Sequence, residues 1–281
     1  MSRGRTDQRR LLVDLIKVVK AKQLEEEITS QIYSQLDIAT TVAHTLGFDI
    51  PELDGKPIDL VQSWGCQNVV IIIIDSLGYD LFIWLMPYLQ NMSALAREGL
   101  LIRARAVSNH TTPAIASILS GLLPEHHGIN DKAGAKESSI LSLPEMASAS
   151  GLKAAVIMEE NGAEVYRGLI EITGGIPDNI PPQNFDREAC RLTIEALSKS
   201  PRLLVTYFIG IDKSVHLGRG TVGIREAALE IDRCIGKIAD NADDETLFIL
   251  CGDHPVHAGP LKRKKEPYSV ALILAKGRGH K

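Results

Sequence analysis

Six short runs of apolar, largely β-branched residues constrain the fold of this chain more than any other feature of its sequence. Polar residues or glycine bound each run, and helix-favouring stretches separate one run from the next. Strands that are apolar along their whole length need cover on both faces, as in parallel sheets. The runs are VVIIIID (69–75), LLIRARAV (100–107), KAAVIM (153–158), LLVTYFI (203–209), LFILCG (247–252) and SVALILA (269–275).

The stretches between these strands predict helices, and the alternation predicts an α/β fold: a doubly wound, mostly parallel sheet with helices on both faces. This core would span residues 69–275. Residues 1–60 differ, because apolar positions at helical spacing predict one helix over 11–32 and a second over 36–48, ended by Gly47. No linker is visible, so we expect a single domain, 1–281. The helices expected within the core are 87–98, 113–120, 143–150, 186–199 and 222–240.

Composition excludes several classes of protein. The net charge of −4 and the isoelectric point of about 6.1 argue against nucleic acid as a specific partner. The longest apolar run is too short to span a bilayer, and no secretory signal opens the sequence, so we expect no membrane partner. Four scattered cysteines fit neither a zinc motif nor a disulfide framework. These features predict a cytoplasmic protein and leave its oligomeric state open.

Polar residues gather where the strands end, which is where ligands bind in an open α/β sheet. Aspartate and histidine without cysteine form a mixed ligand set that suits Zn²⁺ or Mn²⁺. The set is too large for one tetrahedral site and therefore indicates two metals, which together can clamp a phosphoryl group. The residues are Asp75 after the first strand, Asp212 and His216 after 203–209, and Asp253, His254 and His257 after 247–252.

The strand 100–107 leads to a hydroxyl pair, Thr111 and Thr112, at the start of a helix. A helix N-terminus favours an anion, and a metal-bound hydroxyl becomes a nucleophile. The structural alternative is that each aspartate forms a turn or cap and that Thr-Pro simply starts a helix. The combination of such residues at four strand ends favours a catalytic site.

Four blocks carry a resemblance to a known family: VIIIIDSLGYD (70–80), TTPAIASILSGLLPEHHGI (111–129), YFIGIDKSVHLGRG (207–220) and LCGDHPVHAG (250–259). The chain resembles the alkaline phosphatase superfamily, nearest its type I phosphodiesterase/nucleotide pyrophosphatase branch. The resemblance implies that Thr111 is the nucleophile and that Thr112 caps the helix. It implies one metal on Asp75, Thr111, Asp253 and His254, and another on Asp212, His216 and His257.

The chain departs from the family pattern in three ways. Family members place Asn after the HGI segment to hold a phosphoryl oxygen; here Lys132 is at that place and Asn130 two residues earlier, and either could bind it. His280 is an alternative to His257 as the last ligand. The segment 35–60 resembles the one that normally closes the family's sequence, which implies a circular permutation.

The resemblance implies a metal-dependent phosphoester hydrolase, either a phosphodiesterase or a phosphomonoesterase, with Zn²⁺ as the expected ion and Mn²⁺ as the alternative. Its partner would be a small phosphorylated molecule. Two alternatives stay open: a phosphonate hydrolase of the same fold and a non-catalytic metal-binding scaffold. A sulfatase is disfavoured, because TTPAI (111–115) lacks the arginine of the sulfatase motif.

Overall fold

The computed structural model describes residues 31–51, 53–259, 262 and 268–279. The chain divides into two compact units, Met1–Tyr33 and Ser34–Lys281. Of the first unit only residues 31–33 are described, so almost all of the helix predicted over 11–32 lies outside the described residues, as does His280. The expectation of a single domain stays a prediction.

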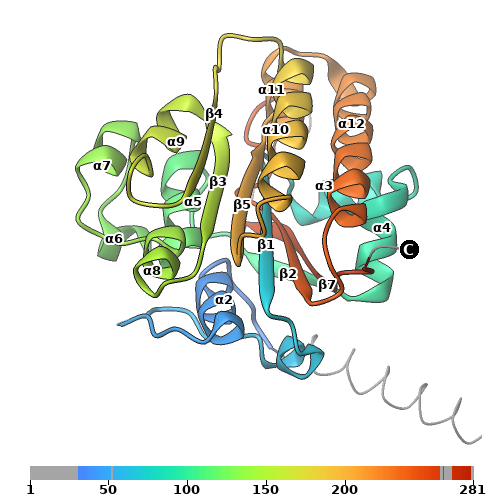
Figure 1. Ribbon diagram of the computed structural model, residues 1–281. Coiled ribbons are helices and arrows are strands. Elements are labelled where there is room, and N and C mark those ends of the chain that lie inside the picture. Colours follow the sequence, from blue (N-terminus) through green and yellow to red (C-terminus); the bar gives the residue numbers. More distant parts are fainter. Residues whose placement is uncertain (1–30, 52, 260–261, 263–267, 280–281) are drawn as a thin grey trace, which may run out of the picture. The chain divides into compact units, whose positions relative to one another are not determined.

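Seven strands in the described part of the second unit form one sheet, in the order β2-β7-β6-β1-β5-β3-β4 (Figure 1). Strand β7 is antiparallel to both of its neighbours, and the other strands share one direction. The prediction of a mostly parallel α/β sheet is therefore confirmed. The strands are β1 Asn68–Ile74, β2 Leu100–Arg105, β3 Ala154–Glu159, β4 Ile172–Ile176, β5 Leu203–Phe208, β6 Thr246–Gly252 and β7 Ser269–Lys276.

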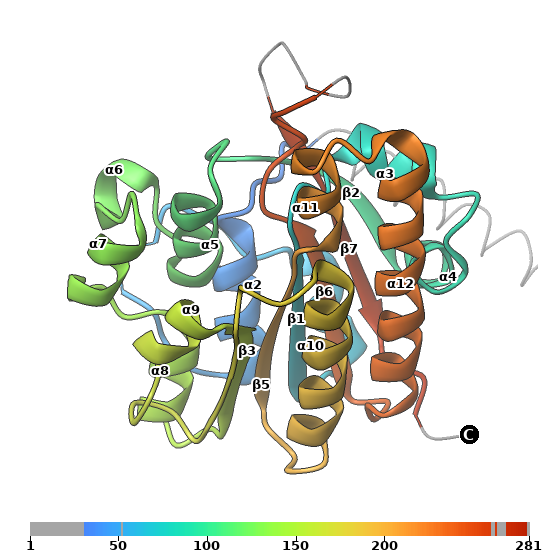
Figure 2. The same ribbon diagram turned by 90° about the horizontal axis from the view of Figure 1, so that it is seen from above.

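Helices cover both faces of this sheet, with α4, α10 and α12 on one face and α2, α5 and α8 on the other (Figure 2). Helix α2 is the one predicted over 36–48, and Gly47 ends it in the left-handed conformation with φ 75°. The helices are α2 Asp37–Leu46, η1 Asp59–Trp64, α3 Tyr79–Leu85, α4 Gln90–Glu98, α5 Thr111–Ser120, α6 Pro124–His127, α7 Lys132–Glu137, α8 Leu143–Ala149, α9 Glu160–Val165, α10 Pro182–Leu197, α11 Gly210–His216 and α12 Gly220–Asp240.

All six predicted strands and all five predicted core helices are present, but the sequence did not indicate β4. This strand has the sequence ITGGI; its first four residues alternate between half-buried and exposed, and only the last, Ile176, is buried. It pairs only with β3, at the edge of the sheet. Two glycines lower the β propensity of this segment, and its low burial leaves no apolar pattern typical of a strand. Pairing with β3 therefore determines its conformation.

The centre of the sheet positions the strand ends that carry polar residues. Strand β1 lies between β6 and β5, runs parallel to both, and is buried from Val69 to Ile74. Because the three strands are adjacent and parallel, the residues that follow them meet at one edge.

All four cysteines are free thiols in the structure: Cys66 is half-buried, and Cys190, Cys234 and Cys251 are buried. None of the described helices combines the length and the apolar character that crossing a membrane requires.

The start of α11 is fixed by a carboxylate from α10. Asp186 accepts a hydrogen bond from the Ile209 N–H at 3.0 Å, and burial raises the pKa of Asp186 to about 7. A Cβ at Gly210 would lie 2.2 Å from Asp186 Oδ2, so the close packing of this carboxylate requires a glycine. Helix α11 carries two of the predicted metal ligands, so this contact helps to position them.

We expect Gly210→Ala to lower the free energy of unfolding by about 1–3 kcal/mol, because the added methyl must displace the buried Asp186 carboxylate. Gly134→Ala in α7 is the matched control: its Cβ would meet only ordinary contacts, and alanine favours a helix by up to about 1 kcal/mol. Urea unfolding of both variants tests this. Equal stability of the two variants would show that the start of α11 is not closely packed.

Candidate active site

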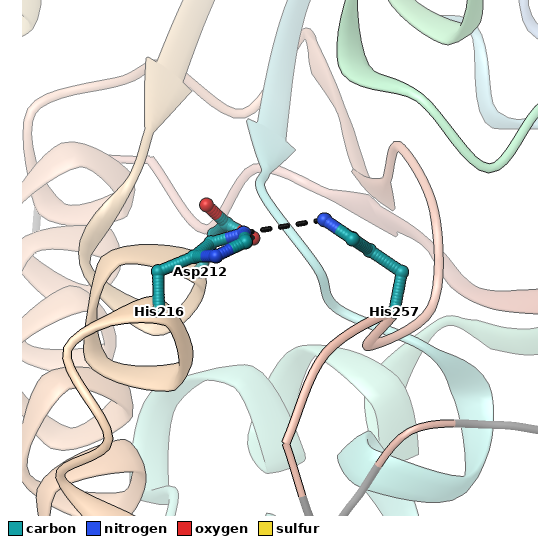
Figure 3. Close-up of side chains that lie close together, drawn as sticks. All are labelled: Asp212, His216 and His257. Atoms are coloured by element: carbon teal, nitrogen blue, oxygen red, sulfur yellow. Dashed lines mark hydrogen bonds and ion pairs between the residues drawn. The ribbon is translucent and has the colours of Figure 1, made fainter.

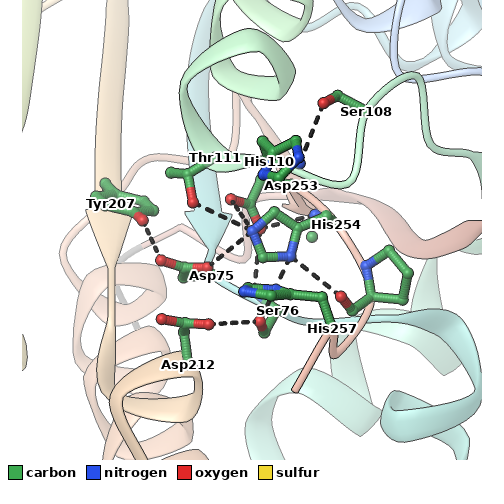
Figure 4. Close-up of polar contacts among 12 residues, drawn as sticks. Asp75, Ser76, Ser108, His110, Thr111, Tyr207, Asp212, Asp253, His254 and His257 are labelled. Carbon is green, nitrogen blue, oxygen red and sulfur yellow. Dashed lines mark hydrogen bonds and ion pairs between the residues drawn. The ribbon is translucent and has the colours of Figure 1, made fainter. Parts of the chain in front are cut away.

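Six of the predicted ligands form two groups at the carboxyl edge of β1, β5 and β6. Figure 4 shows five of them, and Figure 3 shows the sixth, His216. Within each group, one ligand atom from every residue lies within 4.8 Å of the others. The groups divide the residues as the resemblance implied: Asp75, Asp253 and His254 in the first, and Asp212, His216 and His257 in the second.

The first group is buried and presents free ligand atoms to a common point. His254 Nε2 lies 3.4 Å from both Asp75 Oδ1 and Asp253 Oδ2. Among the described residues, neither of these oxygens has a hydrogen-bond partner. His254 Nδ1 lies 3.1 Å from the Pro255 carbonyl, which can only accept, so Nδ1 carries the proton and Nε2 offers its lone pair. Two carboxylate oxygens without hydrogen-bond partners, beside an imidazole nitrogen that offers its lone pair, fit a divalent cation.

The pKa shifts of Asp75 and Asp253 in this first group also favour a bound cation. Burial, followed by repulsion from the Asp253 and Asp212 carboxylates, raises the pKa of Asp75 well above its usual range. Burial also raises the pKa of Asp253 to about 7. Buried carboxylates that repel one another are costly unless a positive charge is close, and a metal ion would supply that charge.

The second group lies on α11 and on the loop after β6 (Figure 3). His216 Nε2 lies 3.4 Å from Asp212 Oδ1, one helical turn away, and 3.2 Å from His257 Nε2. Burial, followed by the nearby His254, lowers the pKa of His257, which favours the neutral ring that binds metals. Two imidazole nitrogens and a carboxylate oxygen that converge in this way also fit a divalent cation.

Ser76 contacts both groups through hydrogen bonds, although no sequence pattern indicated this residue. Its N–H donates to Asp253 Oδ1 at 3.0 Å and its hydroxyl donates to Asp212 Oδ1 at 2.9 Å. Ser76 is buried and has φ 64°, a left-handed conformation that is uncommon outside glycine. The backbone thus turns immediately after Asp75 so that one residue orients a carboxylate from each group.

The hydroxyl of Thr111 lies beside the first group, with Oγ1 3.1 Å from His254 Nε2. Thr111 is the first residue of α5, where backbone N–H groups have no acceptor within the helix. The expectation that Thr112 caps this helix is wrong: His110 occupies the cap position, and no side chain caps the helix. Thr112 is the second helical residue because the helix begins at Thr111, two residues earlier than expected.

The two residues predicted to hold a phosphoryl oxygen are placed differently. Lys132 lines a cavity of about 290 Å³ that Asp75, Thr111 and Asp212 also line. Asn130 is exposed, donates to the Gly128 carbonyl, and is not among the residues that line this cavity. For both residues, a contact with phosphate stays a prediction.

Two further buried residues support the site without having been identified in the sequence. The Tyr207 hydroxyl, on β5, donates to Asp75 Oδ2. Gln35 Nε2 donates to the carbonyls of Gly252 and Asp253, at 2.8 and 2.6 Å. A polar side chain near the end of an otherwise apolar strand was a signal that could have identified Tyr207, whereas nothing near Gln35 indicates its partners.

Two family models match overlapping parts of the sequence. The sulfatase model matches residues 67–190, and the type I phosphodiesterase / nucleotide pyrophosphatase model matches residues 155–276. Each covers less than half of the chain. No curated protein matches the chain by sequence.

Several solved structures share the fold at low sequence identity. A protein in the alkaline phosphatase superfamily from Vibrio parahaemolyticus is 15% identical with a TM-score of 0.57, covering 88% of this chain and 69% of that chain. A 2-O GAG sulfatase is 12% identical with a TM-score of 0.57, covering 75% and 65%. Phosphonoacetate hydrolase from Sinorhizobium meliloti 1021 is 12% identical with a TM-score of 0.56, covering 73% and 59%. This chain thus spans about three fifths of the length of these two enzymes.

The two family models and the fold together show that the chain belongs to the alkaline phosphatase superfamily.

We expect loss of the Ser76 hydroxyl to weaken metal binding by the Asp212 group by about tenfold or more, because an oriented ligand loses its hydrogen bond. Binding by the Asp253 group should change less, since the backbone N–H of residue 76 remains. Calorimetric titration of metal-free protein with Zn²⁺ separates the two steps.

Two variants separate the hydroxyl from the backbone conformation. Ser76→Gly and Ser76→Ala both remove the hydroxyl, but only glycine accepts a left-handed φ without strain. Equal weakening in both variants is the expected result. Weakening in Ser76→Ala alone would assign the effect to backbone strain instead.

Proposed function

We propose that this protein is a metal-dependent hydrolase of phosphoric esters, a phosphodiesterase or phosphomonoesterase, with Thr111 as its nucleophile. The observation that carries the proposal is the position of the Thr111 hydroxyl. Its oxygen lies 3.1 Å from His254 Nε2, the same nitrogen that faces the orphaned oxygens of Asp75 and Asp253. The hydroxyl therefore belongs to the same convergent set of ligand atoms.

The residues present fit two divalent ions, Zn²⁺ first and Mn²⁺ as the alternative. Asp75, Thr111, Asp253 and His254 would hold one ion, and Asp212, His216 and His257 the other. When bound, such ions neutralise phosphoryl charge and lower the pKa of a coordinated hydroxyl or water.

The chain's own residues then perform a two-step transfer. Thr111 Oγ1 attacks phosphorus and forms a new P–O bond, while the bond to the alcohol breaks and the alcohol leaves with a proton. Water then hydrolyses the threonyl phosphate, which releases the phosphate product and restores the hydroxyl. Tyr207 and Ser76 keep Asp75, Asp212 and Asp253 oriented throughout, because each donates a hydrogen bond to a carboxylate oxygen.

Sulfate esters are the nearest competing substrates, since a sulfatase model matches residues 67–190. The side chain of Ile115 lines the cavity at the place where the sulfatase motif carries arginine. One element of the sulfatase motif is therefore absent, which disfavours a sulfate ester as the substrate.

The proposal includes a circular permutation, in which residues 35–60 take the place of the family's usual closing segment. In support, α2 packs against β1, α5 and α8, and Gln35 just before it contacts the loop that carries Asp253. The segment is thus an integral part of the second unit rather than an appended extension.

We expect wild-type protein with Zn²⁺ or Mn²⁺ to hydrolyse p-nitrophenyl phosphate or bis-p-nitrophenyl phosphate, and Thr111→Ala to lose at least about 1,000-fold in kcat. Thr112→Ala is the matched control, since it removes a neighbouring hydroxyl that also lines the cavity but that no hydrogen bond joins to His254. Release of p-nitrophenol measures turnover, and elemental analysis measures bound metal.

The outcomes separate the competing functions. Preference for p-nitrophenyl sulfate would overturn the phosphoester assignment in favour of a sulfatase. Turnover of phosphonoacetate alone would favour a phosphonate hydrolase. Failure to bind Zn²⁺ or Mn²⁺, together with no turnover, would leave a scaffold protein.

A further inference from the structure

The cavity of about 290 Å³ extends the proposed catalytic site in one direction. Its polar end is formed by Asp75, Thr111 and Asp212. From there it runs between α5 on one side and the segment from β3 to α9 on the other, with α7 among the elements that line it. A molecule whose phosphoryl group meets Thr111 can therefore place a substituent in this space.

The cavity as a whole exposes more apolar than polar surface, although Ser138, Ser142, Glu145 and Asn161 also line it. Ile115 and Leu119 line the cavity from α5, Met158 and Val165 from the opposite side, and Ile140 from the loop before α8. Among the described residues that line it, only Tyr166 and Tyr207 are aromatic, and Tyr207 is engaged with Asp75. Aliphatic walls favour an apolar substituent, and a volume near the lower end for ligand pockets favours a compact one.

The charges of the cavity disfavour a second anionic group on the substrate. Lys132 Nζ lies 3.7 Å from both Glu159 Oε1 and Asp178 Oδ2, so two carboxylates already surround this cation. Lys213, the other lysine of the cavity, directly follows Asp212 and so belongs to the polar end. Burial raises the pKa of Glu159, so the negative charge of this carboxylate is stabilised by the nearby Lys132. A substrate anion that paired with Lys132 would remove that stabilisation.

We propose that this cavity binds one ester substituent of the substrate, and that this substituent is a compact, uncharged aliphatic group. The inference rests on the proposed function and deepens it: the natural substrate is an alkyl phosphoester rather than a nucleotide, a polyphosphate or a carboxylated phosphonate. Specificity then resides in α5, α7 and α9, apart from the strand ends that carry the metal ligands.

The test uses n-alkylphosphonates, which carry the phosphoryl group but no ester bond to hydrolyse. Their affinity for Zn²⁺-loaded protein, measured by calorimetry, should rise from methyl to butyl to hexyl by about threefold per methylene until the cavity is filled. Butylphosphonate should also bind more tightly than 3-phosphonopropionate, which has similar length but a carboxylate at its far end. Equal affinity along the alkyl series, or tighter binding of the carboxylate, would overturn the proposal.

Two alanines of α7 supply a matched pair of variants. Ala135 lines the cavity, whereas Ala133 is exposed and does not line it. Ala135→Phe should abolish the gain from butyl to hexyl while methylphosphonate binding stays unchanged, and Ala133→Phe should preserve the whole series. Identical behaviour of the two variants would contradict the assignment of the cavity.

The alkylphosphonate binding series and the hydrolysis assay test two different proposals, so their outcomes can be distinguished. Chain-length-dependent binding without hydrolysis of any phosphoester would overturn the proposed function. Hydrolysis of phosphoesters with a flat binding series would overturn the aliphatic cavity and leave the proposed function intact.

Discussion

Three buried carboxylates at one edge of the sheet are the constraint on which the rest of the structure depends. Asp75, Asp212 and Asp253 follow three adjacent parallel strands, and none is more than 7% exposed. Such charges repel one another in a medium of low polarity, so the fold must hold them by hydrogen bonds until a cation offsets the repulsion. Ser76 and Tyr207 provide these bonds. Metal binding and stability should accordingly be coupled, because the ion favours only the folded arrangement.

A single buried glutamine connects this arrangement to the loop that carries Thr111, the proposed nucleophile. Gln35 donates to the carbonyls of Gly252 and Asp253, and its Oε1 accepts from the Val107 N–H at 3.0 Å. Val107 lies in the loop that leads from β2 to Thr111, so one side chain joins the loop of the first metal group to the loop of the hydroxyl. A buried amide with every polar atom bonded costs little and specifies one geometry. Residues near the start of the described chain thus help to position a site formed by much later segments.

The sequence predicted the sheet and the edge of the site because both depend on local pattern. Apolar runs indicated every strand of the described sheet except β4. Parallel strands necessarily bring Asp75, Asp212 and Asp253 to one edge. The features that escaped prediction depend on partners distant in the sequence. Strand β4 exists because β3 pairs with it, and the left-handed Ser76 is held by Asp253, 177 residues later. No pattern around such residues encodes these contacts, so only the folded chain reveals them.

Apart from Thr111, the residues proposed to bind metal lie on different elements from those proposed to bind the rest of the substrate, which explains why the chain resembles two families. The proposed metal ligands come from strand ends, and sulfate and phosphate esters both present anionic oxygens to such ligands, so the ligands alone do not discriminate between them. Discrimination must come from the surface that meets the remaining substrate, and in the site proposed here α5, α7 and α9 contribute that surface. The sulfatase match covers this surface as well as Asp75, whereas the phosphodiesterase match covers Asp212 and Asp253. Ile115 on α5 lines the cavity and lies outside the proposed ligand set, so it is more informative about the substrate than any of the proposed metal ligands.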